Sequence, residues 1–385
     1  MTDEANNETT QRRSDGRRVV LGFGSTFWEG PAGWLLVLLV VAAGIAAITF
    51  VYKSGDEGGQ ADLVVDIDDV MVNSLPGAII TGMELRVLDG MPAGDDEDFF
   101  AVMIDNIHVA RPAAGIADAP LVIEALAEGN ITRLMAFFTD DMDLRRIGPV
   151  RSARPYFIDW AAEYGAVYIH VGGSPDALDL LAASSVRNLN QFFWGGYFWR
   201  DRDRYAPHNV ITSTDLLHEA LEEFNVVATE VDNTRPFKGG GPDSIIIEGT
   251  SAEEIRIDYS TPTYRVVWSY DKETNRYARY QGRGEFTDET DRQVLADNII
   301  VQITDMEVVD RVGRREVRTV GEGDAIVFRD GQAIEAKWLK ENGGRTKYIY
   351  TYISDEIPLN VGTTWIEVVG DEEMVEYESE KVREQ

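Results

Sequence analysis

The chain has 385 residues, of which 44% are hydrophobic and 27% charged, so it is long enough and apolar enough to form two folded domains. Its formal net charge of -31 excludes an overall basic footprint, and we therefore expect no nucleic-acid partner. The absence of cysteine excludes disulfides, thiolate metal sites and a lipid-modified cysteine, and the four histidines are too widely spaced for a short zinc motif. We expect neither a metal nor a cofactor.

The N-terminal region predicts a membrane anchor. Residues 1–33 are polar and predict a disordered cytoplasmic tail. Trp34–Val51 carries no charge over eighteen residues, and together with Tyr52 it predicts a transmembrane helix over residues 34–52. Four arginines precede this span and only Lys53 follows it closely, which places the N-terminus in the cytoplasm and the bulk of the chain outside. Cleavage as a signal peptide is the alternative, but the length of the apolar run favours an uncleaved single-pass anchor in the cell membrane.

A linker with lead-in strands is predicted over residues 53–98, and a mixed α/β domain over residues 99–234. Two predicted helices begin with a proline, which is tolerated in the first helical turn. Ser174 has the side chain of a helix cap directly before the second of these prolines. The predicted strands are Phe99–Asp105, Leu121–Leu126, Thr132–Phe138 and Ala166–Val171, and the predicted helices are Pro155–Tyr164, Pro175–Ala183 and Asp215–Glu223.

The following part of the chain, residues 235–370, predicts a β-rich domain, and residues 371–385 a charged tail. Three consecutive glycines between two prolines in Arg235–Asp243 predict an interdomain break. Asp330–Gly331 is a two-residue hairpin signal between two apolar runs. The predicted β segments are residues 254–259, 264–270, 298–304, 325–338, 346–353 and 363–369.

An arginine-rich stretch, Gly148 to Arg154 (GPVRSAR), directly precedes the helix predicted to begin at Pro155. Arg151, Ser152 and Arg154 would surround the N-terminus of that helix, whose free N–H groups attract anions. Arginines are unfavourable beside the positive end of a helix dipole unless a negative group lies between them. This pattern predicts an anion-binding or carboxylate-binding site. The alternative is that these arginines pair with nearby carboxylates on a solvated surface.

Two further segments contain candidates for the same site. His170 ends a predicted strand, and the glycines of the following Gly172–Gly173–Ser174 turn would let the backbone approach a ligand. Arg200–Asn209 follows a cluster of aromatic residues, which could stack on a ligand or fill a core. Within it, His208 with Asp201 could be a general base and the group that orients it. Glu128 and Arg133 could form a structural pair or a polar wall.

These segments resemble the YerB-like family, bacterial proteins classed as lipoproteins whose function is uncharacterised. The resemblance covers roughly residues 75–370 and implies a two-domain protein attached to the membrane outside the cytoplasm. This chain departs from the lipid-anchored members because it has no cysteine, and a membrane helix would replace the lipid. The segments that carry the resemblance are Arg111–Pro112, Glu128 to Arg133, Gly148 to Arg154, Tyr168 to Pro175, Arg200 to Asn209, Trp338–Lys340 and the motif VGTTWIEVV.

We therefore predict a single-pass membrane protein with an α/β domain of mixed sheet and helices, followed by a β-rich domain. Its predicted function is the non-enzymatic binding of an anionic or carboxylate-bearing ligand, such as a cell-wall component or peptide. One alternative is a hydrolase or transferase with His208 or His170 as base, and another is a structural partner in a cell-wall complex that uses an exposed Phe192–Trp199 surface. The predicted ligand-binding residues are Glu128, Arg133, Arg151, Ser152, Arg154, His170, Gly172, Gly173, Ser174, Arg200, Asp201, His208 and Asn209.

A geometric expectation accompanies this list. Most of these residues lie at the end of a predicted strand or the start of a predicted helix. In open α/β sheets such positions meet at one edge, where ligands bind. We therefore expect seven of them to line one concave face: Arg133, Arg151, Arg154, His170, Ser174, Arg200 and His208.

Overall fold

The chain is represented by a computed structural model that describes residues 18–23, 48–53, 60–66, 85–93, 98–224, 234–238, 247, 249–352 and 354–378. It divides into two compact units, Met1–Ala78 and Ile79–Gln385. Each unit is described here by itself.

The first unit contains a three-stranded antiparallel sheet in the order β1-β3-β2, formed by β1 (Arg18–Phe23), β2 (Ile48–Lys53) and β3 (Gln60–Asp66). Strand β1 lies in the predicted disordered tail, and β2 takes the last five residues of the predicted transmembrane helix. Both strands are rich in β-branched and aromatic residues, which favour extended backbone. Residues 34–47 of the predicted helix lie outside the described residues. Among those that are described, no helix is long and apolar enough to cross a membrane.

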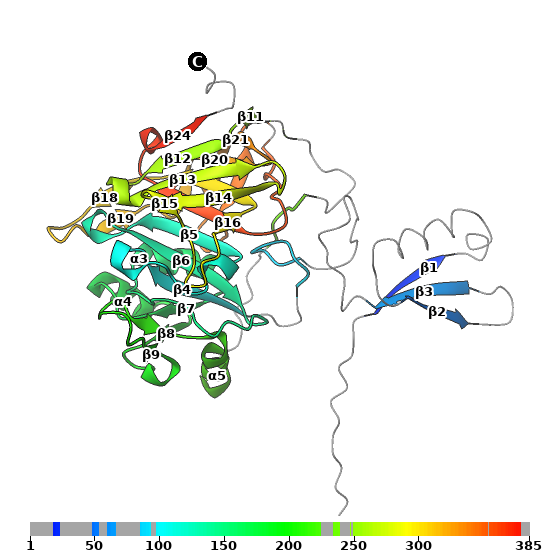
Figure 1. Ribbon diagram of the computed structural model, residues 1–385, viewed down its shortest axis with the longest axis horizontal. Coiled ribbons are helices and arrows are strands. Elements are labelled where there is room, and N and C mark those ends of the chain that lie inside the picture. Colours follow the sequence, from blue (N-terminus) through cyan, green and yellow to red (C-terminus); the bar gives the residue numbers. More distant parts are fainter. Residues whose placement is uncertain are drawn as a thin grey trace, which may run out of the picture. The chain divides into compact units, whose positions relative to one another are not determined.

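An eleven-stranded mixed sheet organises the second unit (Figure 1). It joins the cyan-to-green strands of the N-terminal half to the yellow-to-red strands of the C-terminal half, because β23 pairs in parallel with β5. Along the sheet the order is β11 (Thr250–Ser251), β21 (Gln332–Lys340), β20 (Gly321–Arg329), β17 (Asn298–Ile303), β23 (Thr364–Val369), β5 (Leu121–Leu126), β6 (Thr132–Thr139), β4 (Phe99–Asp105), β7 (Val167–His170) and β8 (Asn188–Asn190), with β22 (Lys347–Tyr350) beside β21.

Three helices accompany this sheet in the described residues: α3 (Pro155–Glu163), α4 (Pro175–Ala183) and α5 (Thr214–Phe224). The predicted helices and the four predicted strands of this half are confirmed, with ends that differ by at most one residue. Ser174 caps α4 as predicted, because its hydroxyl oxygen accepts a hydrogen bond from the N–H of Ala177 at 3.3 Å. The local signals of proline, cap and apolar period therefore fix these elements correctly.

A six-stranded antiparallel sheet belongs to the C-terminal half. Its strands alternate buried and partly exposed residues, so one face packs against the main sheet and the other faces solvent. In the eleven-stranded sheet, the predicted turn at Asp330–Gly331 is confirmed, since it joins β20 to β21. The sheet comprises β15 (Gly284–Glu285), β14 (Arg276–Gln281), β13 (Arg265–Asp271), β12 (Glu254–Asp258) and β24 (Val375–Glu378), with β16 (Leu295–Ala296) beside β14; two small ribbons pair β9 (Trp199–Arg200) with β10 (Val210–Ile211) and β18 (Met306–Val308) with β19 (Arg315–Val317).

Alternate residues of β4 supply two separate cores. Phe100 and Ile104 face the core that includes Trp268 of the six-stranded sheet, whereas Ala101 and Met103 face the core that includes Phe157 of α3. This division follows from the period of two in a strand. It also means that consecutive residues at the end of β4 point to opposite faces of the sheet.

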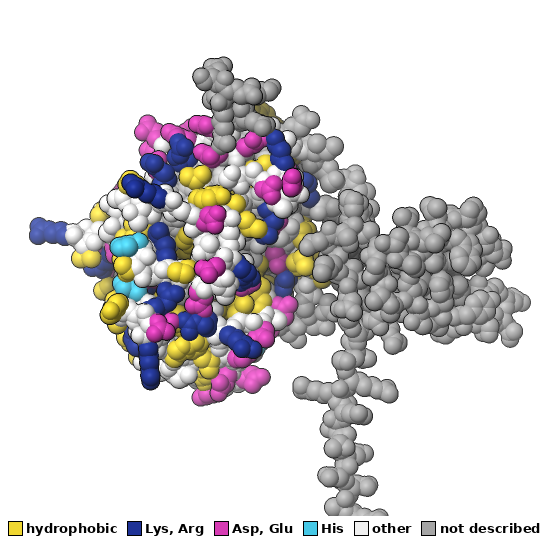
Figure 2. Space-filling view, in the orientation of Figure 1, with side chains coloured by type: hydrophobic (Ala, Val, Ile, Leu, Met, Phe, Trp, Pro, Cys, Tyr) yellow, Lys and Arg dark blue, Asp and Glu magenta, His cyan; other side chains and the backbone are white. Residues whose placement is uncertain are grey.

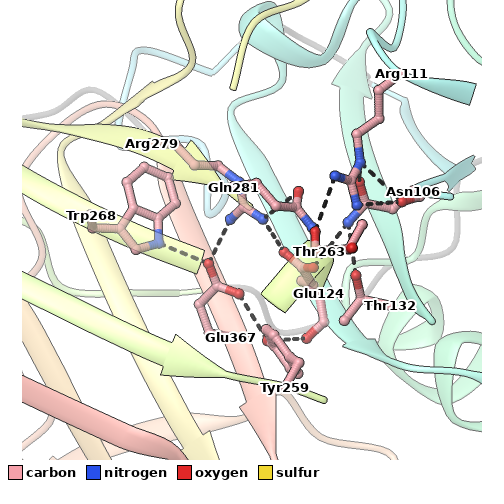
Figure 3. A network of polar contacts seen from close by, with 10 residues as sticks. All are labelled: Asn106, Arg111, Glu124, Thr132, Tyr259, Thr263, Trp268, Arg279, Gln281 and Glu367. Atoms are coloured by element: carbon pink, nitrogen blue, oxygen red, sulfur yellow. Dashed lines mark hydrogen bonds and ion pairs between the residues drawn. The ribbon is translucent and has the colours of Figure 1, made fainter. Parts of the chain in front are cut away.

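The two halves are joined by a buried ion network, drawn in Figure 3. Arg279 of β14 pairs with Glu124 of β5 and with Glu367 of β23, and all three side chains are fully buried. Its guanidinium carbon also lies 4.3 Å from the ring centre of Trp365. Burial raises the pKa of Glu367 to about 7, despite the opposing charge of Arg279. The charges are costly to bury, so Glu124 of the N-terminal half depends on Arg279 of the C-terminal half for its counter-charge.

Candidate functional site

The candidate site lies at the carboxyl end of β4, whose last residue is Asp105. Asp105 is paired across the sheet with Arg133 of β6. On the other side of β4 the GPVRSAR motif runs as extended backbone, and the N–H of Arg151 donates to the carbonyl oxygen of Met103 at 2.8 Å. The same segment continues to the start of α3. On the way, the N–H of Ala153 donates to the carbonyl oxygen of Gly172 at 2.9 Å. The backbone thus places Arg133 and Arg151 on either side of Asp105.

Asp105 holds two cationic or ionisable side chains with one carboxylate oxygen. Its Oδ2 lies 2.9 Å from Nε of Arg151 and 2.6 Å from Nδ1 of His208. Its other oxygen accepts a hydrogen bond from the N–H of Ile107 at 3.1 Å. The side chain of Asp105 is only 4% exposed, while those of Arg151 and His208 are 20% and 18% exposed. The buried anion therefore holds His208 by a hydrogen bond and Arg151 by an ion pair in which Nε forms no hydrogen bond, and both side chains still reach solvent.

A second carboxylate, Glu128, lies between the other two arginines. Its side chain is bonded to Nη2 of Arg133 at 3.1 Å and to Nε of Arg154 at 2.8 Å, with a further hydrogen bond from Nη2 of Arg154. Burial acts to raise the pKa of Glu128, but the charges of Arg133 and Arg154 outweigh it, and the pKa falls to about 2. Nη1 of Arg133 also donates to the carbonyl oxygen of Ser152 at 2.9 Å.

The N-terminus of α3 explains why Glu128 is needed there. Arg154 is the residue before Pro155, and its positive charge opposes the positive end of the helix dipole. Glu128 supplies the negative group that the sequence pattern requires at this point. It comes from η4 (Glu128–Asn130), the short 3-10 turn that links β5 to β6. The predicted structural pairing of Glu128 with Arg133 is confirmed by the salt bridge.

The cluster retains a net positive charge. Arg133, Arg151 and Arg154 carry three positive charges against the two carboxylates of Asp105 and Glu128. Burial lowers the pKa of both Arg151 and Arg154, and the charge of Arg133 lowers them further. Guanidinium groups that repel one another in a partly buried place are stabilised by an additional anion.

This positive charge is local. On the face shown in Figure 2, Lys and Arg side chains alternate with Asp and Glu over the described surface, without a continuous basic area. A ligand would therefore be held by a few directed contacts rather than by a broad field. Such contacts suit a carboxylate, whose two oxygens match the paired N–H groups of arginine.

The C-terminal half reaches the edge of this cluster. Nη2 of Arg315, in β19, donates to Oδ1 of Asn130 at 2.7 Å, and its Nε donates to the carbonyl oxygen of Ala127 at 3.4 Å. Figure 1 shows the β18–β19 ribbon next to α3. Residues from both halves thus border the turn that carries Glu128.

The structure places His170 differently from the prediction. Its side chain is completely buried, with Nδ1 2.7 Å from the carbonyl oxygen of Gly172 and Nε2 3.2 Å from Oδ1 of Asn188. Burial lowers its pKa, which favours the neutral form. His170 therefore cannot line an exposed face, and its expected place there was wrong because a strand-end residue can also point into the core.

The Gly172–Gly173–Ser174 turn also has a packing role. Gly172 has a φ of +57°, and a Cβ there would lie 2.5 Å from the ring of Phe192. At Gly173 a Cβ would lie 3.1 Å from Cβ of Ala153. The glycines therefore make room for an aromatic ring and a neighbouring segment of backbone, where the sequence predicted a ligand. The hydroxyl of Ser174 is used to cap α4.

Arg200, Asp201 and Asn209 form a separate network in the β9–β10 hairpin. Nη1 of Arg200 donates to Oδ1 of Asn209 at 2.8 Å. Asp201 pairs with Arg146 at 2.5 Å, so it is not the orienting partner of His208 that the sequence suggested. No hydrogen bond or ion pair among the described residues joins Arg200 to the arginine cluster. Arg133 and Arg154 share Glu128, and Arg151 and His208 share Asp105, so these four residues lie near one another, whereas His170, Ser174 and Arg200 are engaged elsewhere. The concave face itself stays a prediction.

The aromatic segment divides between surface and core. Phe192 and Phe193 are 69% and 78% exposed, whereas Tyr197 and Phe198 are buried. The second part of this segment therefore belongs to the core, as one of the two interpretations of the sequence had it. Its first part presents aromatic rings to solvent, with Phe192 packed over the turn that follows β7.

Asp105 is the important residue that the sequence reasoning missed. The available signal was its position, since it ends the strongest apolar strand and is followed by another polar residue, Asn106. Asn106 points to the opposite face, where its amide donates to Glu124 at 3.1 Å and to Thr132 at 2.8 Å.

For metals, the described residues contain no group of three or more His, Asp or Glu that could hold an ion.

Comparisons with known proteins agree with this architecture. The N-terminal domain of "Protein of unknown function (DUF3048)" matches residues 88–227, and the C-terminal domain of the same family matches residues 255–366. The Bacillus subtilis (strain 168) protein named "Putative lipoprotein YerB" is 33% identical over 331 residues, covering 85% of this chain and 95% of that protein. The crystal structure of YerB from Bacillus subtilis superposes with a TM-score of 0.68 and 30% identity, covering 77% of this chain and all of that one. The chain therefore belongs to the DUF3048 family, is related to YerB, and has a mixed, sheet-rich fold of two domains with few helices.

Proposed function

We propose that this protein binds a carboxylate-bearing ligand at the arginine cluster, on the extracytoplasmic side of a membrane. The observation that carries the proposal is the hydrogen bonding of Arg151 and His208, which leaves nitrogen atoms without a partner among the described residues. Asp105 forms an ion pair with Nε of Arg151 and a hydrogen bond with Nδ1 of His208, and no described residue accepts a hydrogen bond from either Nη atom of Arg151. The two Nη atoms of Arg151 are therefore available to an external acceptor.

The charge balance supports an anion at this place. The cluster carries one more positive than negative charge, within a chain whose formal net charge is -31. Free carboxylates of the protein are abundant, yet none of the described ones occupies the Nη atoms of Arg151. A ligand carboxylate would accept two parallel hydrogen bonds from that guanidinium, and it would lie near the solvent-facing edge of His208.

The proposed location rests on the relative and on the sequence. The related Bacillus subtilis protein is named as a lipoprotein, which is consistent with attachment to a membrane outside the cytoplasm. This chain lacks the cysteine that a lipid would need, and the apolar segment that begins at Trp34 is its proposed anchor. A cell-wall component or peptide, both rich in carboxylates, is the proposed ligand class.

The test uses residues 79–385, since they form a compact unit and contain a length of chain equivalent to the whole solved relative. Thermal shift and titration calorimetry with N-acetylmuramic acid, succinate and inorganic phosphate should show saturable stabilisation by the carboxylates. Arg151→Ala should weaken carboxylate binding about 10-fold to 100-fold, because a charge-assisted hydrogen bond contributes about 1.5–3 kcal/mol.

Arg145→Ala is the matched control, because Arg145 is an exposed arginine only six positions earlier in the chain. It should bind as the unmodified protein does. Equal binding by a correctly folded Arg151→Ala variant would refute the proposal, and circular dichroism of both variants establishes that they are folded.

A further inference from the structure

We propose that the same site hydrolyses an ester bond in a carboxylate-bearing ligand, with His208 as the general base. This inference rests on the proposed function, since the arginine cluster must first hold the ligand. It adds a reaction that simple binding does not require. The reason is the arrangement of Asp105, His208 and Arg151 around one buried oxygen atom.

The tautomer of His208 follows from its partner. Nδ1 of His208 lies 2.6 Å from Oδ2 of Asp105, and an ionised carboxylate can only accept hydrogen bonds. Nδ1 must therefore carry the proton and donate a hydrogen bond to Asp105. In neutral His208 this leaves the lone pair on Nε2, the atom without a partner among the described residues. A base with its far nitrogen oriented by a carboxylate is the arrangement that general-base catalysis uses.

Asp105 and the loop that carries His208 are each held in place by hydrogen bonds. Asp105 ends a strand in the interior of the main sheet, and the N–H of Ile107 fixes its second oxygen. His208 lies in the hairpin loop between β9 and β10, which Arg204 ties to the carbonyl oxygens of Ala110 and Pro112 at 2.5 and 2.6 Å. The imidazole is thus positioned by the fold before any ligand arrives.

The other histidines lack this arrangement. Both ring nitrogens of His170 are engaged in the interior, as described above. Nε2 of His218 contacts the carbonyl oxygen of Asp140. His108 is exposed and forms no ion pair with a described carboxylate. His208 alone, of these four, combines an oriented Nδ1 with a free Nε2.

The proposed reaction consumes only water. A water molecule gives one proton to Nε2 of His208 while its oxygen bonds to the carbonyl carbon of the ester. The electron pair of the carbonyl double bond moves to its oxygen, and the Nη groups of Arg151 stabilise the negative charge that forms there. The double bond then re-forms and the ester C–O bond breaks. The leaving oxygen takes the proton from His208, so that an acid and an alcohol depart and the base is neutral again.

An ester suits this site because one proton, taken up and returned by one histidine, is sufficient for the whole reaction. His208 and Arg151 would be catalytic residues, since both touch the reacting groups. Asp105 would be a positioning residue that acts through His208. The ester carbonyl would take the position at the Nη groups of Arg151 that a carboxylate takes in the proposed function. The excess positive charge of the cluster would attract the second, free carboxylate of the ligand.

The experiment follows the release of p-nitrophenol from p-nitrophenyl hemisuccinate, an ester with a free carboxylate, by residues 79–385. We expect kcat/KM to exceed the value for the uncharged p-nitrophenyl acetate. His208→Gln should lower kcat/KM about 100-fold or more, as expected when a general base is removed. His108→Gln, which removes an exposed histidine whose side chain forms no hydrogen bond or ion pair with a described residue, should leave the rate unchanged.

A second variant separates the roles. Arg151→Lys keeps the positive charge but loses the paired N–H geometry at the reacting carbonyl, so it should lower kcat/KM for hemisuccinate and acetate alike. Asp105→Asn should shift the pH profile of kcat/KM, which a residue of purely structural importance would not do. These readouts remain informative even if His208→Gln fails to fold.

The outcomes distinguish the two proposals. Equal rates for His208→Gln and the unmodified protein, or equal loss in His108→Gln, would overturn the hydrolytic proposal. Saturable binding of succinate without turnover of the hemisuccinate would also overturn it, while the binding function would stand. If no carboxylate probe binds at all, the binding proposal fails as well.

Discussion

Asp105 shows how one residue can organise a site that it scarcely exposes. Its carboxylate is buried at the end of a central strand and contacts Arg151, His208 and the backbone of Ile107. Burying a charge is unfavourable unless it is paired, and here the pairing also orients two side chains toward solvent. The neighbouring Asn106 points the other way and contacts the buried Glu124. The arginine cluster and the interdomain ion network therefore meet at two adjacent residues.

Glu128 gives a pH-dependent prediction at the same scale. Its pKa falls from an ordinary 4.5 to about 2 in the folded protein. A lowered pKa stabilises the fold above the unfolded value, and that stability is lost as the pH falls from about 4.5 toward 2. We expect Glu128→Gln to lower the free energy of unfolding by about 1–3 kcal/mol at pH 7, and by much less near pH 2.5.

Urea denaturation at both pH values measures this difference. Glu285→Gln, at an exposed position of β15, is the matched control and should leave the free energy of unfolding nearly unchanged at either pH. A Glu128→Gln variant that loses the same free energy at both pH values would contradict the charge-based explanation.

Among the elements, the β20–β21 hairpin depends most clearly on its turn. Asp330 and Gly331 have φ values of +57° and +70°, as a tight turn between twisted strands requires. Each strand has nine residues, and β20 connects to the centre of the main sheet through β17. Gly331 is also packed closely, since a Cβ there would lie 2.5 Å from the ring of Tyr270.

Two glycine variants separate the backbone cost from the packing cost. Gly343 has a similar φ of +78° but open space around it. We expect Gly343→Ala to cost about 1 kcal/mol, from the positive φ alone. Gly331→Ala should cost about 1–3 kcal/mol more, because the ring of Tyr270 must move.

Thermal or urea denaturation of both variants provides the measurement. A free energy of unfolding that falls equally in Gly331→Ala and Gly343→Ala would show that Tyr270 yields without cost. The comparison is informative because the two positions share the same unfavourable backbone conformation.

At the scale of the whole molecule, the two halves named in the family share one sheet. Strand β23 from the C-terminal half lies between β17 and β5, so the central pairing crosses from one half to the other. Arg279 of the C-terminal half neutralises Glu124 of the N-terminal half in the same region. Each half therefore satisfies backbone and side-chain groups that the other cannot satisfy alone.

We predict that neither half folds independently. Residues 79–233 alone would expose the edge of β5 and leave Glu124 unpaired, and removing one partner of a buried ion pair typically costs about 3–5 kcal/mol. Separate expression should give fragments without cooperative thermal unfolding, while co-expression should restore a complex that unfolds cooperatively. Circular dichroism melting curves and size-exclusion chromatography measure both properties. Cooperative unfolding of the isolated N-terminal fragment would contradict the prediction.

The sequence by itself determined the local elements and much of the cluster. Strand β5 and helix α4 have the predicted ends, because apolar period, proline and cap are short-range signals. The GPVRSAR motif identified Arg151 and Arg154, since arginines beside a helix N-terminus require a counter-charge. The hairpin at Asp330–Gly331 followed from backbone geometry that few residue pairs allow.

Only the tertiary structure decided which of these residues meet. His208 contacts Asp105 across 103 positions of the chain, and Arg279 contacts Glu124 across 155. Local patterns specify which face of an element is apolar, but they do not specify the order of strands in a sheet or the partner of a charged side chain. For the same reason the sequence could not tell that His170 points into the core. Strand order places Asp105 between Arg133 and Arg151, and that placement is a property of the assembled sheet.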